Sequence, residues 1–168
     1  MSTTDVLVDA FQRVRDAVYP AANGLSSEEL SYRPDPESNP IAWLVWHLTR
    51  IQDDQVATLA GSEQVWTSHG WAERFALPLP DVDTGYGHSP DEVTKVVADA
   101  DLLLGYFEDV HASTLSFLGS LDETGLDRVV DRSWDPPVTV ETRLVSVLAD
   151  DLQHAGQAAY VRGVLLRR

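Results

Sequence analysis

Four long segments of this chain carry apolar residues at helical spacing, and this pattern excludes most folds at once. The segments cover roughly residues 4–22, 40–60, 89–120 and 139–168. Proline or glycine interrupts the chain between each pair of segments, and no stretch shows the alternation of a half-buried strand. The sequence therefore predicts an all-α fold, a four-helix bundle in which each apolar face packs against its neighbours.

The second and third segments are separated by a long connection. Residues 62–88 hold two tryptophans and then Pro78, Pro80, Gly85 and Gly87. We expect a short helical piece near residues 63–75 followed by a long irregular loop. Loops longer than about 12–15 residues in compact domains are commonly functional. At 168 residues the chain is predicted to form a single domain over residues 1–168.

Composition excludes several classes of function. The net charge is −15, with 27 acidic against 12 basic residues, so the chain is expected to repel nucleic acid. There is no cysteine, which excludes disulfides, thiolate metal sites and a cysteine nucleophile, so any thiol chemistry needs an external thiol. The amino terminus lacks signal-peptide features and no segment has the length of a membrane span, which predicts a cytoplasmic protein without membrane partners.

The segment NPIAWLVWHLTRIQDD places His47 in the middle of an apolar helix. Trp43, His47, Arg50 and Asp54 are spaced by four, three and four residues and share one stripe of that helix. Arg50 is a candidate for binding a substrate carboxylate, and Asp54 for orienting His47 or Arg50. The alternative is an Arg50–Asp54 ion pair at the helix surface, worth only about 0.3–0.5 kcal/mol.

A second polar stripe lies in the last helix, in the sequence DDLQHAGQ. Asp150 and His154 are four residues apart, so a carboxylate and an imidazole can converge on one ion, although a solvated hydrogen bond is the commoner explanation of such a pair alone. Gln157 continues the stripe, either contacting a metal-bound water or substrate or filling a bundle layer. Asp151 points about a hundred degrees away, so it is predicted to be solvated or to support the site without ligating.

The two stripes together make a metal site more specific than either stripe alone, because apolar helices in a small bundle must face one another. His47, Asp150 and His154 would supply two imidazoles and one carboxylate with an open position. This set is typical of catalytic zinc or another divalent ion such as nickel.

Other histidines and tryptophans have less specific surroundings. His69 and His88 lie in loop-like sequence and are expected at the surface, and His111 is expected to be partly exposed. Trp66 and Trp71, in the same loop region, are candidates for lining an aromatic pocket.

The two histidine segments resemble the signatures of the DinB-like (YfiT-like) metalloenzyme superfamily. DDLQHAGQ is similar to that family's usual H-x-x-x-H-R-G-Q pattern, with Asp150 in place of the first histidine and Ala155 in place of the arginine. A carboxylate in the first position resembles the mycothiol-dependent maleylpyruvate isomerase branch, where a glutamate serves with two histidines. The helix layout resembles that of the family over nearly the whole chain. The resemblance implies metal ligands at His47, Asp150 and His154.

The resemblance also implies a function. The expected protein is a metal-dependent transferase or isomerase that uses a low-molecular-weight thiol, such as mycothiol or bacillithiol, on a small electrophile. The chain uses arginine far more than lysine, as proteins from high-GC genomes do, and this favours mycothiol as the thiol. Two alternatives stay open: a non-catalytic bundle, dimeric and stress-associated or ligand-binding, and a hydrolase in which metal-bound water is the nucleophile.

Overall fold

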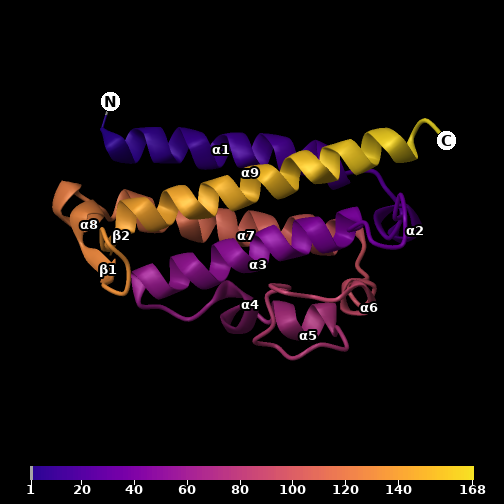
Figure 1. The fold of residues 1–168 in the computed structure, drawn as a ribbon, viewed down its shortest axis with the longest axis horizontal. Helices are drawn as coiled ribbons and strands as arrows, with labels where there is room; N and C mark the ends of the chain where they lie inside the picture. Colours follow the sequence, from indigo (N-terminus) through magenta and orange to yellow (C-terminus); the bar gives the residue numbers. More distant parts are fainter. Residues whose placement is uncertain (1) are drawn as a thin grey trace.

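Four long helices build the molecule, which a computed structural model describes over residues 2–168. They are α1 (Thr3–Ala22), α3 (Ile41–Ala60), α7 (Ala100–Gly119) and α9 (Val140–Leu165) (Figure 1). Helix α9 packs against α1 and α3, and α7 packs against the same two helices from the other side. Helices α3 and α9 run in opposite directions (Figure 1). The predicted all-α four-helix bundle is confirmed.

Helix α3 is the most enclosed of the four. Fifteen of its twenty residues are buried, because other helices cover one side and residues from the following connection cover another. By contrast, α1 buries a single stripe that includes Phe11, Val14 and Val18. Polar side chains on α3 therefore need partners inside the protein wherever they point.

The ends of α3 are set by local backbone preference. Pro40 occupies the cap position, and no side chain caps this end. Gly61 ends the helix with φ at 69°, a left-handed conformation that glycine adopts without steric cost.

The predicted third helix is broken into two, which corrects its expected start at residue 89. A short helix, α6 (Pro90–Val93), is capped by Ser89, and α7 begins only at Ala100. Asp99 accepts a hydrogen bond from the Leu102 backbone N–H and so starts the second helix. Two N-caps ten residues apart produce two helices.

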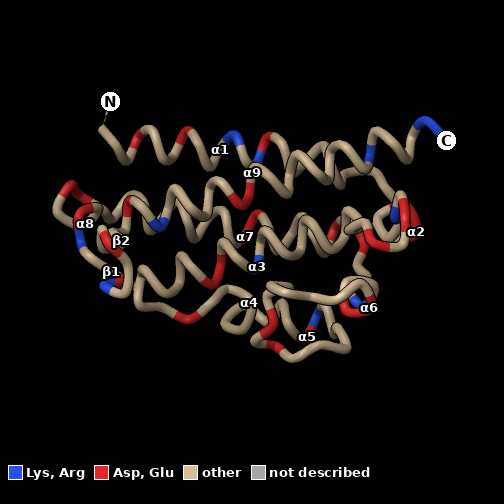
Figure 2. The backbone as a smooth tube through the Cα atoms, in the orientation of Figure 1, with Lys and Arg blue, Asp and Glu red and all other residues tan. Residues whose placement is uncertain are grey.

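The smaller elements lie in the connections. They are α2 (Ser27–Leu30), α4 (Val65–Ser68), α5 (Trp71–Phe75), α8 (Glu123–Asp127), and an antiparallel pair of strands, β1 (Val129–Asp131) and β2 (Val138–Thr139). Residues 76–88 follow α5 without regular structure, as expected, and are called the 76–88 loop below. Acidic residues are spread along the helices and connections (Figure 2). Within residues 2–168, no helix combines the length and apolarity needed to cross a membrane.

Candidate metal centre

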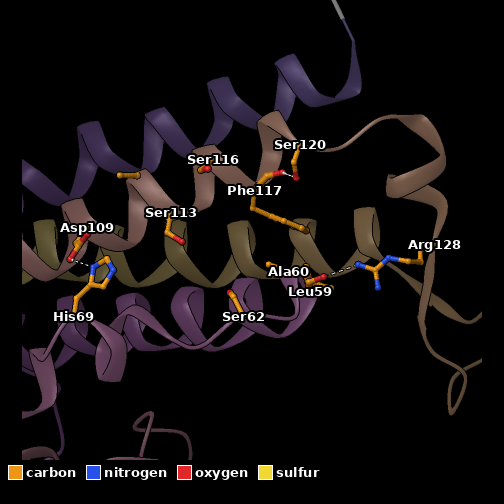
Figure 3. A pocket seen from close by; sticks show the side chains of 11 residues that line it. Leu59, Ala60, Ser62, His69, Asp109, Ser113, Ser116, Phe117, Ser120 and Arg128 are labelled. Carbon is orange, nitrogen blue, oxygen red and sulfur yellow. Dashed lines mark hydrogen bonds and ion pairs between the residues drawn. The ribbon is translucent and has the colours of Figure 1, made fainter.

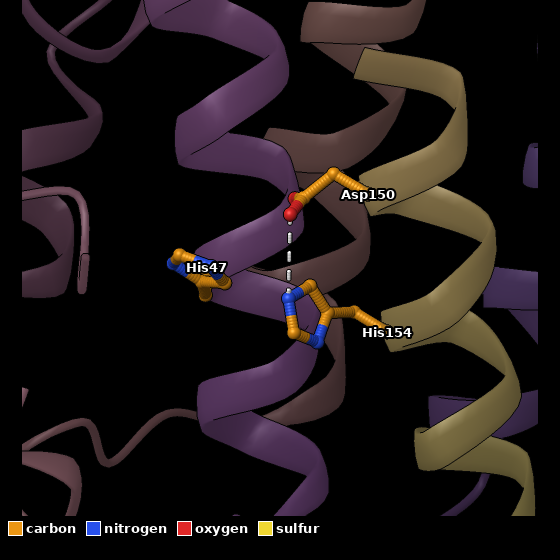
Figure 4. A group of neighbouring side chains, drawn as sticks. All are labelled: His47, Asp150 and His154. Atoms are coloured by element: carbon orange, nitrogen blue, oxygen red, sulfur yellow. Dashed lines mark ion pairs between the residues drawn. The ribbon is translucent and has the colours of Figure 1, made fainter. Parts of the chain in front are cut away.

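Three side chains converge between the facing helices α3 and α9. One nitrogen or oxygen atom from each of His47, Asp150 and His154 lies within 4.8 Å of the others (Figure 4). The two imidazole rings meet edge to face with centroids 4.8 Å apart, and His154 Nε2 is 3.5 Å from Asp150 Oδ1. His47 is buried, whereas Asp150 and His154 are partly exposed. The structure thus brings together the three residues predicted as metal ligands, which we call the triad.

His47 is held in one tautomer by the 76–88 loop. Its Nδ1 lies 2.6 Å from the backbone carbonyl oxygen of Thr84, and a carbonyl can only accept, so Nδ1 carries the proton. The lone pair is then on Nε2, the arrangement usual in metal-binding histidines. Trp43 stacks on the ring at 4.5 Å, and burial lowers the pKa of His47 below its ordinary value. His47 is therefore neutral and oriented for coordination.

Gly85 is the residue that lets the loop approach His47 closely. Its φ is 85°, and a Cβ at this position would lie 2.9 Å from His47 Nδ1 and 3.0 Å from Trp46. Both the backbone conformation and the space require glycine here. The loop therefore contributes a carbonyl, from Thr84, only because its neighbour has no side chain.

His154 is oriented from its own helix. Its Nδ1 donates to Gln157 Oε1 at 2.9 Å, which leaves the Nε2 lone pair on the side of Asp150. Burial alone would lower the pKa of His154, but the contacts with Asp150 and Gln157 outweigh burial and raise it. Gln157 is exposed, so the interpretation of Gln157 as filling for a bundle layer is wrong.

Asp151, the neighbour of Asp150, points into the core. Its exposed fraction is 0%, and neither carboxylate oxygen has a hydrogen-bond partner among the described residues. Burial, reinforced by the nearby charge of Asp150, raises the pKa of Asp151 well above its usual range. The prediction of a solvated Asp151 is wrong, because the helix turn that exposes Asp150 buries the next residue.

Arg50 does not form the predicted surface ion pair with Asp54. Its side chain is completely buried and donates to the backbone carbonyls of Asp81 at 3.3 Å and Asp83 at 3.1 Å. Another donor bonds Gln64 Oε1 at 2.7 Å, while Asp54 accepts from Gln64 Nε2 at 2.8 Å. Arg50 thus stabilises the 76–88 loop, which orients His47. Its hydrogen bonds go to protein groups and not to a substrate carboxylate.

The carboxylate beside Arg50 is Asp53. Asp53 accepts hydrogen bonds from the Val65 and Trp66 backbone N–H groups at 2.8 and 2.7 Å and from the Tyr106 hydroxyl at 2.8 Å. Burial raises the pKa of Asp53, and these hydrogen bonds act in the opposite direction. We call Arg50, Asp53, Gln64 and Tyr106 the buried polar cluster.

The remaining aromatic predictions are mixed. His69 is at the surface, as expected, but His88 lies between Trp43 Nε1 and the Asp83 carboxylate at 3.1 and 2.9 Å, and its side chain is only 4% exposed. His111 is 4% exposed, so the predictions of a surface position for His88 and of partial exposure for His111 are wrong. Two aromatic side chains expected to line a pocket are instead buried against Tyr106: Trp66 and Trp71.

Two hollows differ in their relation to the triad. One, of about 660 Å³, lies against the C-terminal half of α7, and its charged and histidine side chains already pair: His69 with Asp109, and Arg128 with the Leu59 carbonyl (Figure 3). The other, of about 310 Å³, has Asp150 in its wall and opens beside the triad. Only the second hollow joins the predicted metal ligands.

Three contributors to this region are not predicted from the sequence: Thr84 and Gly85, which contact His47, and Arg143, which lines the 310 Å³ hollow together with Asp150. The length of the loop favours a functional role, but the contact of one carbonyl with His47 has no signature in the sequence. Arg143 did leave a signal, because it precedes Asp150 by seven residues and therefore lies on the same helical stripe.

Fold and site together define a helical-bundle protein with a His, Asp, His set suited to a metal ion. The chain belongs to the DinB superfamily, whose family model matches residues 10–158. This superfamily is metal-binding. The chain is also similar to a solved structure described as a conserved protein of Enterococcus faecalis, with 35% identity, 100% of this chain and 99% of that chain covered, and a TM-score of 0.93. No curated protein matches the chain.

Proposed function

We propose that this protein binds one divalent transition-metal ion, zinc or nickel, through His47, Asp150 and His154. The observation that carries the proposal is the convergence of three ligand atoms within 4.8 Å, with both imidazoles held by hydrogen bonds at Nδ1. Each histidine therefore offers Nε2, and its other nitrogen is occupied by an oxygen acceptor, which is the support that metal-binding histidines usually have.

The chemistry of this donor set fits such an ion. Two neutral imidazoles and one carboxylate suit zinc, nickel and related divalent ions, and three protein ligands leave at least one position for a substrate. His47 meets the first requirement, since burial keeps it neutral, and the partly exposed Asp150 and His154 leave the outer side accessible. Closed structural zinc sites, in contrast, use four protein ligands.

The proposed reaction is transfer or isomerisation with an external low-molecular-weight thiol of the mycothiol type and a small electrophile. A bound divalent ion would lower the pKa of the thiol and stabilise its thiolate. The chain itself has no cysteine, so the thiol must come from outside. Asp150 in the first ligand position supports a relation to the maleylpyruvate isomerase branch, which also uses a carboxylate there.

The side chains around the triad determine from where a substrate can approach. Trp43 and the 76–88 loop cover His47 on its buried side, which excludes water from that imidazole. Asp150 and His154 have side-chain exposed fractions of 34% and 18%. Thiol and electrophile must therefore approach along α9, where the 310 Å³ hollow opens.

The test is metal content per chain by elemental analysis after equal exposure to zinc and nickel. Wild-type protein should hold about one equivalent, and His154→Ala should lose it. His69→Ala, which removes a histidine outside the triad, should keep it. Metal that stays in His154→Ala, or is absent from wild type, would contradict the proposal.

A second measurement separates the reaction classes. Metal-loaded protein is mixed with chlorodinitrobenzene in the presence and absence of mycothiol. Turnover that needs the thiol, with release of chloride and formation of the thioether, supports transfer, and conversion to dinitrophenol without any thiol would instead indicate a hydrolase. Bound metal with neither activity would leave a non-catalytic metal-binding bundle.

A further inference from the structure

The hollow beside the triad is a groove between α3 and α9. Its volume is about 310 Å³. Four of its side chains come from α9, two from α3 and one from the 76–88 loop: Arg143, Ser146, Val147, Asp150, Ile51, Gln55 and Tyr86. Because α3 and α9 are antiparallel, the steps of four from His47 to Ile51 and Gln55 run alongside the α9 stripe from Asp150 back to Arg143. The groove therefore leads directly from the triad to Arg143.

The two ends of the groove have opposite charge. Asp150 forms one end, and Arg143 forms the other with a side chain that is 31% exposed. Arg143 donates one hydrogen bond, to Gln55 Oε1 at 3.1 Å, and forms an ion pair with the Asp131 carboxylate at 3.7 Å, which is beyond hydrogen-bond distance. Guanidinium has five N–H donors, so most of them stay available to a ligand.

The middle of the groove is mainly apolar; Ser146 is polar, and its hydroxyl donates to the Thr142 carbonyl at 3.0 Å. Ile51 and Val147 line it from the two helices, and Tyr86, which is 87% exposed, stands at its outer edge. An apolar segment between two polar ends is the usual composition of a small-molecule site, in which few polar groups fix the orientation. Acidic residues are spread over the whole chain, so a local cation is needed to hold an anion here (Figure 2).

The spacing defines the ligand. Arg143 and Asp150 are seven residues apart, which is two helical turns or roughly 10 Å. We infer that the groove binds a small linear molecule whose carboxylate pairs with Arg143 while its other end reaches the metal ligands at Asp150. This inference rests on the proposed function and specifies its substrate class. A carboxylate fits because guanidinium can bind it through two parallel hydrogen bonds. Arg143 thus takes the role that the sequence suggested for Arg50.

The experiment compares two thiols of equal length that differ only in charge. Cobalt(II)-loaded protein is titrated with ω-mercaptooctanoate and with ω-mercaptooctanol, and thiolate ligation is read from the sulfur-to-cobalt absorption band. The extended chain of either probe covers two helical turns. Wild type should bind the acid about tenfold more tightly than the alcohol, since an ion-paired hydrogen bond forms only with the acid. Mercaptopropionate, too short to reach Arg143, should show no such advantage over mercaptopropanol.

Matched variants assign the effect to Arg143. The preference for the acid should disappear in Arg143→Gln and remain in Arg167→Gln, which removes an equal charge at the end of the same chain segment. Both variants are checked for folding by their thermal unfolding. Equal affinity for acid and alcohol in wild type, or an unchanged preference in Arg143→Gln, would overturn the inference.

A metal-free arm keeps this inference separate from the proposed function. Octanoate and octanol are titrated into the metal-free protein and followed by nuclear magnetic resonance of the groove residues. If cobalt or thiol fails to bind but octanoate still binds in an Arg143-dependent way, the proposed function fails and the carboxylate site stands. If both thiols ligate cobalt equally and octanoate does not bind, the carboxylate site fails and the metal centre stands.

Discussion

Helix α3 contributes residues to two polar groups, His47 to the triad and Arg50 and Asp53 to the buried polar cluster, and the two groups differ in whether their atoms are already bonded. In the buried polar cluster, Arg50 donates to carbonyls and to Gln64, and Asp53 accepts from two backbone N–H groups and a hydroxyl. In the triad, His47 uses Nδ1 to bond Thr84, and its other nitrogen has no hydrogen-bond partner among the described residues. One group is saturated, and the other keeps lone pairs for a ligand.

This difference separates residues that support a site from residues that form it. Sequence spacing placed Arg50 and His47 on the same stripe and could not tell them apart. The number of unused donors and acceptors does tell them apart, because a buried group with every bond made has nothing left for a substrate. The cluster is expected to control stability, and the triad is expected to control metal binding.

The largest effect is expected from removing the Asp53 carboxylate from the buried polar cluster. Asp53→Ala would leave Arg50 without a nearby carboxylate and the Val65 and Trp66 N–H groups without an acceptor. Removing one partner of a buried charged pair costs about 3–5 kcal/mol of unfolding free energy. Urea unfolding followed by circular dichroism measures this loss.

The milder Asp53→Asn keeps a side chain that can accept one of these hydrogen bonds, so it should lose less. Metal content of whichever variant stays folded should remain at the wild-type value. A loss of less than about 1 kcal/mol in Asp53→Ala would place the cluster among weak surface-like pairs and remove the contrast.

The next prediction tests the loop contact that joins the two regions. Gly85→Ala forces a Cβ to within 2.9 Å of His47 Nδ1, so the ring must move and its bond to Thr84 must lengthen. Losing the group that orients a metal-binding histidine typically lowers metal affinity by about 10–100-fold. Competition with a chromophoric zinc chelator measures this affinity.

Gly87→Ala is the matched control. Gly87 has φ at 77°, close to that of Gly85, but a Cβ there would meet nothing within 4 Å. Both variants therefore carry the same backbone strain, of order 1–3 kcal/mol in stability, and only Gly85→Ala should lose metal affinity. Equal affinity losses in the two variants would mean that loop strain, and not the contact with His47, is responsible.

Helical pattern and site differ in how much of them the sequence reveals. The helical period, the glycine at 61 and the loop composition were sufficient for the bundle, because helix formation and burial follow from local spacing. The triad was predicted because helices that face each other must bring their polar stripes together. The apolar spacing does not distinguish Asp99 as a second cap, so the sequence predicts a continuous third helix.

Contacts across the chain were harder to predict. Nothing local shows that Arg50 would reach the carbonyls of Asp81 and Asp83, about thirty residues away, or that His88 would pack on Trp43. The residues next to an arginine in the sequence do not show whether its side chain is buried or exposed. Such assignments depend on the path of the 76–88 loop, which has no periodic pattern to fix it.

A smaller effect is expected on the α9 side of the triad. Gln157→Leu removes the acceptor of His154 Nδ1 and should lower metal affinity by about tenfold, at the lower end of the range for such supporting residues. Gln153→Leu is the control, because Gln153 is exposed on the same helix and bonds only the Ala149 carbonyl. Equal affinities in the two variants would show that the α9 histidine needs no orientation, in contrast to His47.

The smallest effect is expected at His111, a buried polar residue that belongs to neither group. Its ring nitrogens have no hydrogen-bond partners among the described residues, and burial lowers its pKa below 6.5, opposed by Glu108 and Asp16 and reinforced by Arg15. The unfolded chain therefore binds a proton at higher pH than the folded one, and wild type loses stability as pH falls below 6.5. His111→Leu should lack this loss. Its unfolding free energy, measured relative to wild type, should therefore increase as pH is lowered from about 8 to about 5. His47 and His154 titrate in both proteins and cancel in the difference. A difference independent of pH would mean that His111 has a hydrogen-bond partner in solution. A buried polar atom without a partner among residues 2–168 would then not by itself identify a site that binds a proton or a metal.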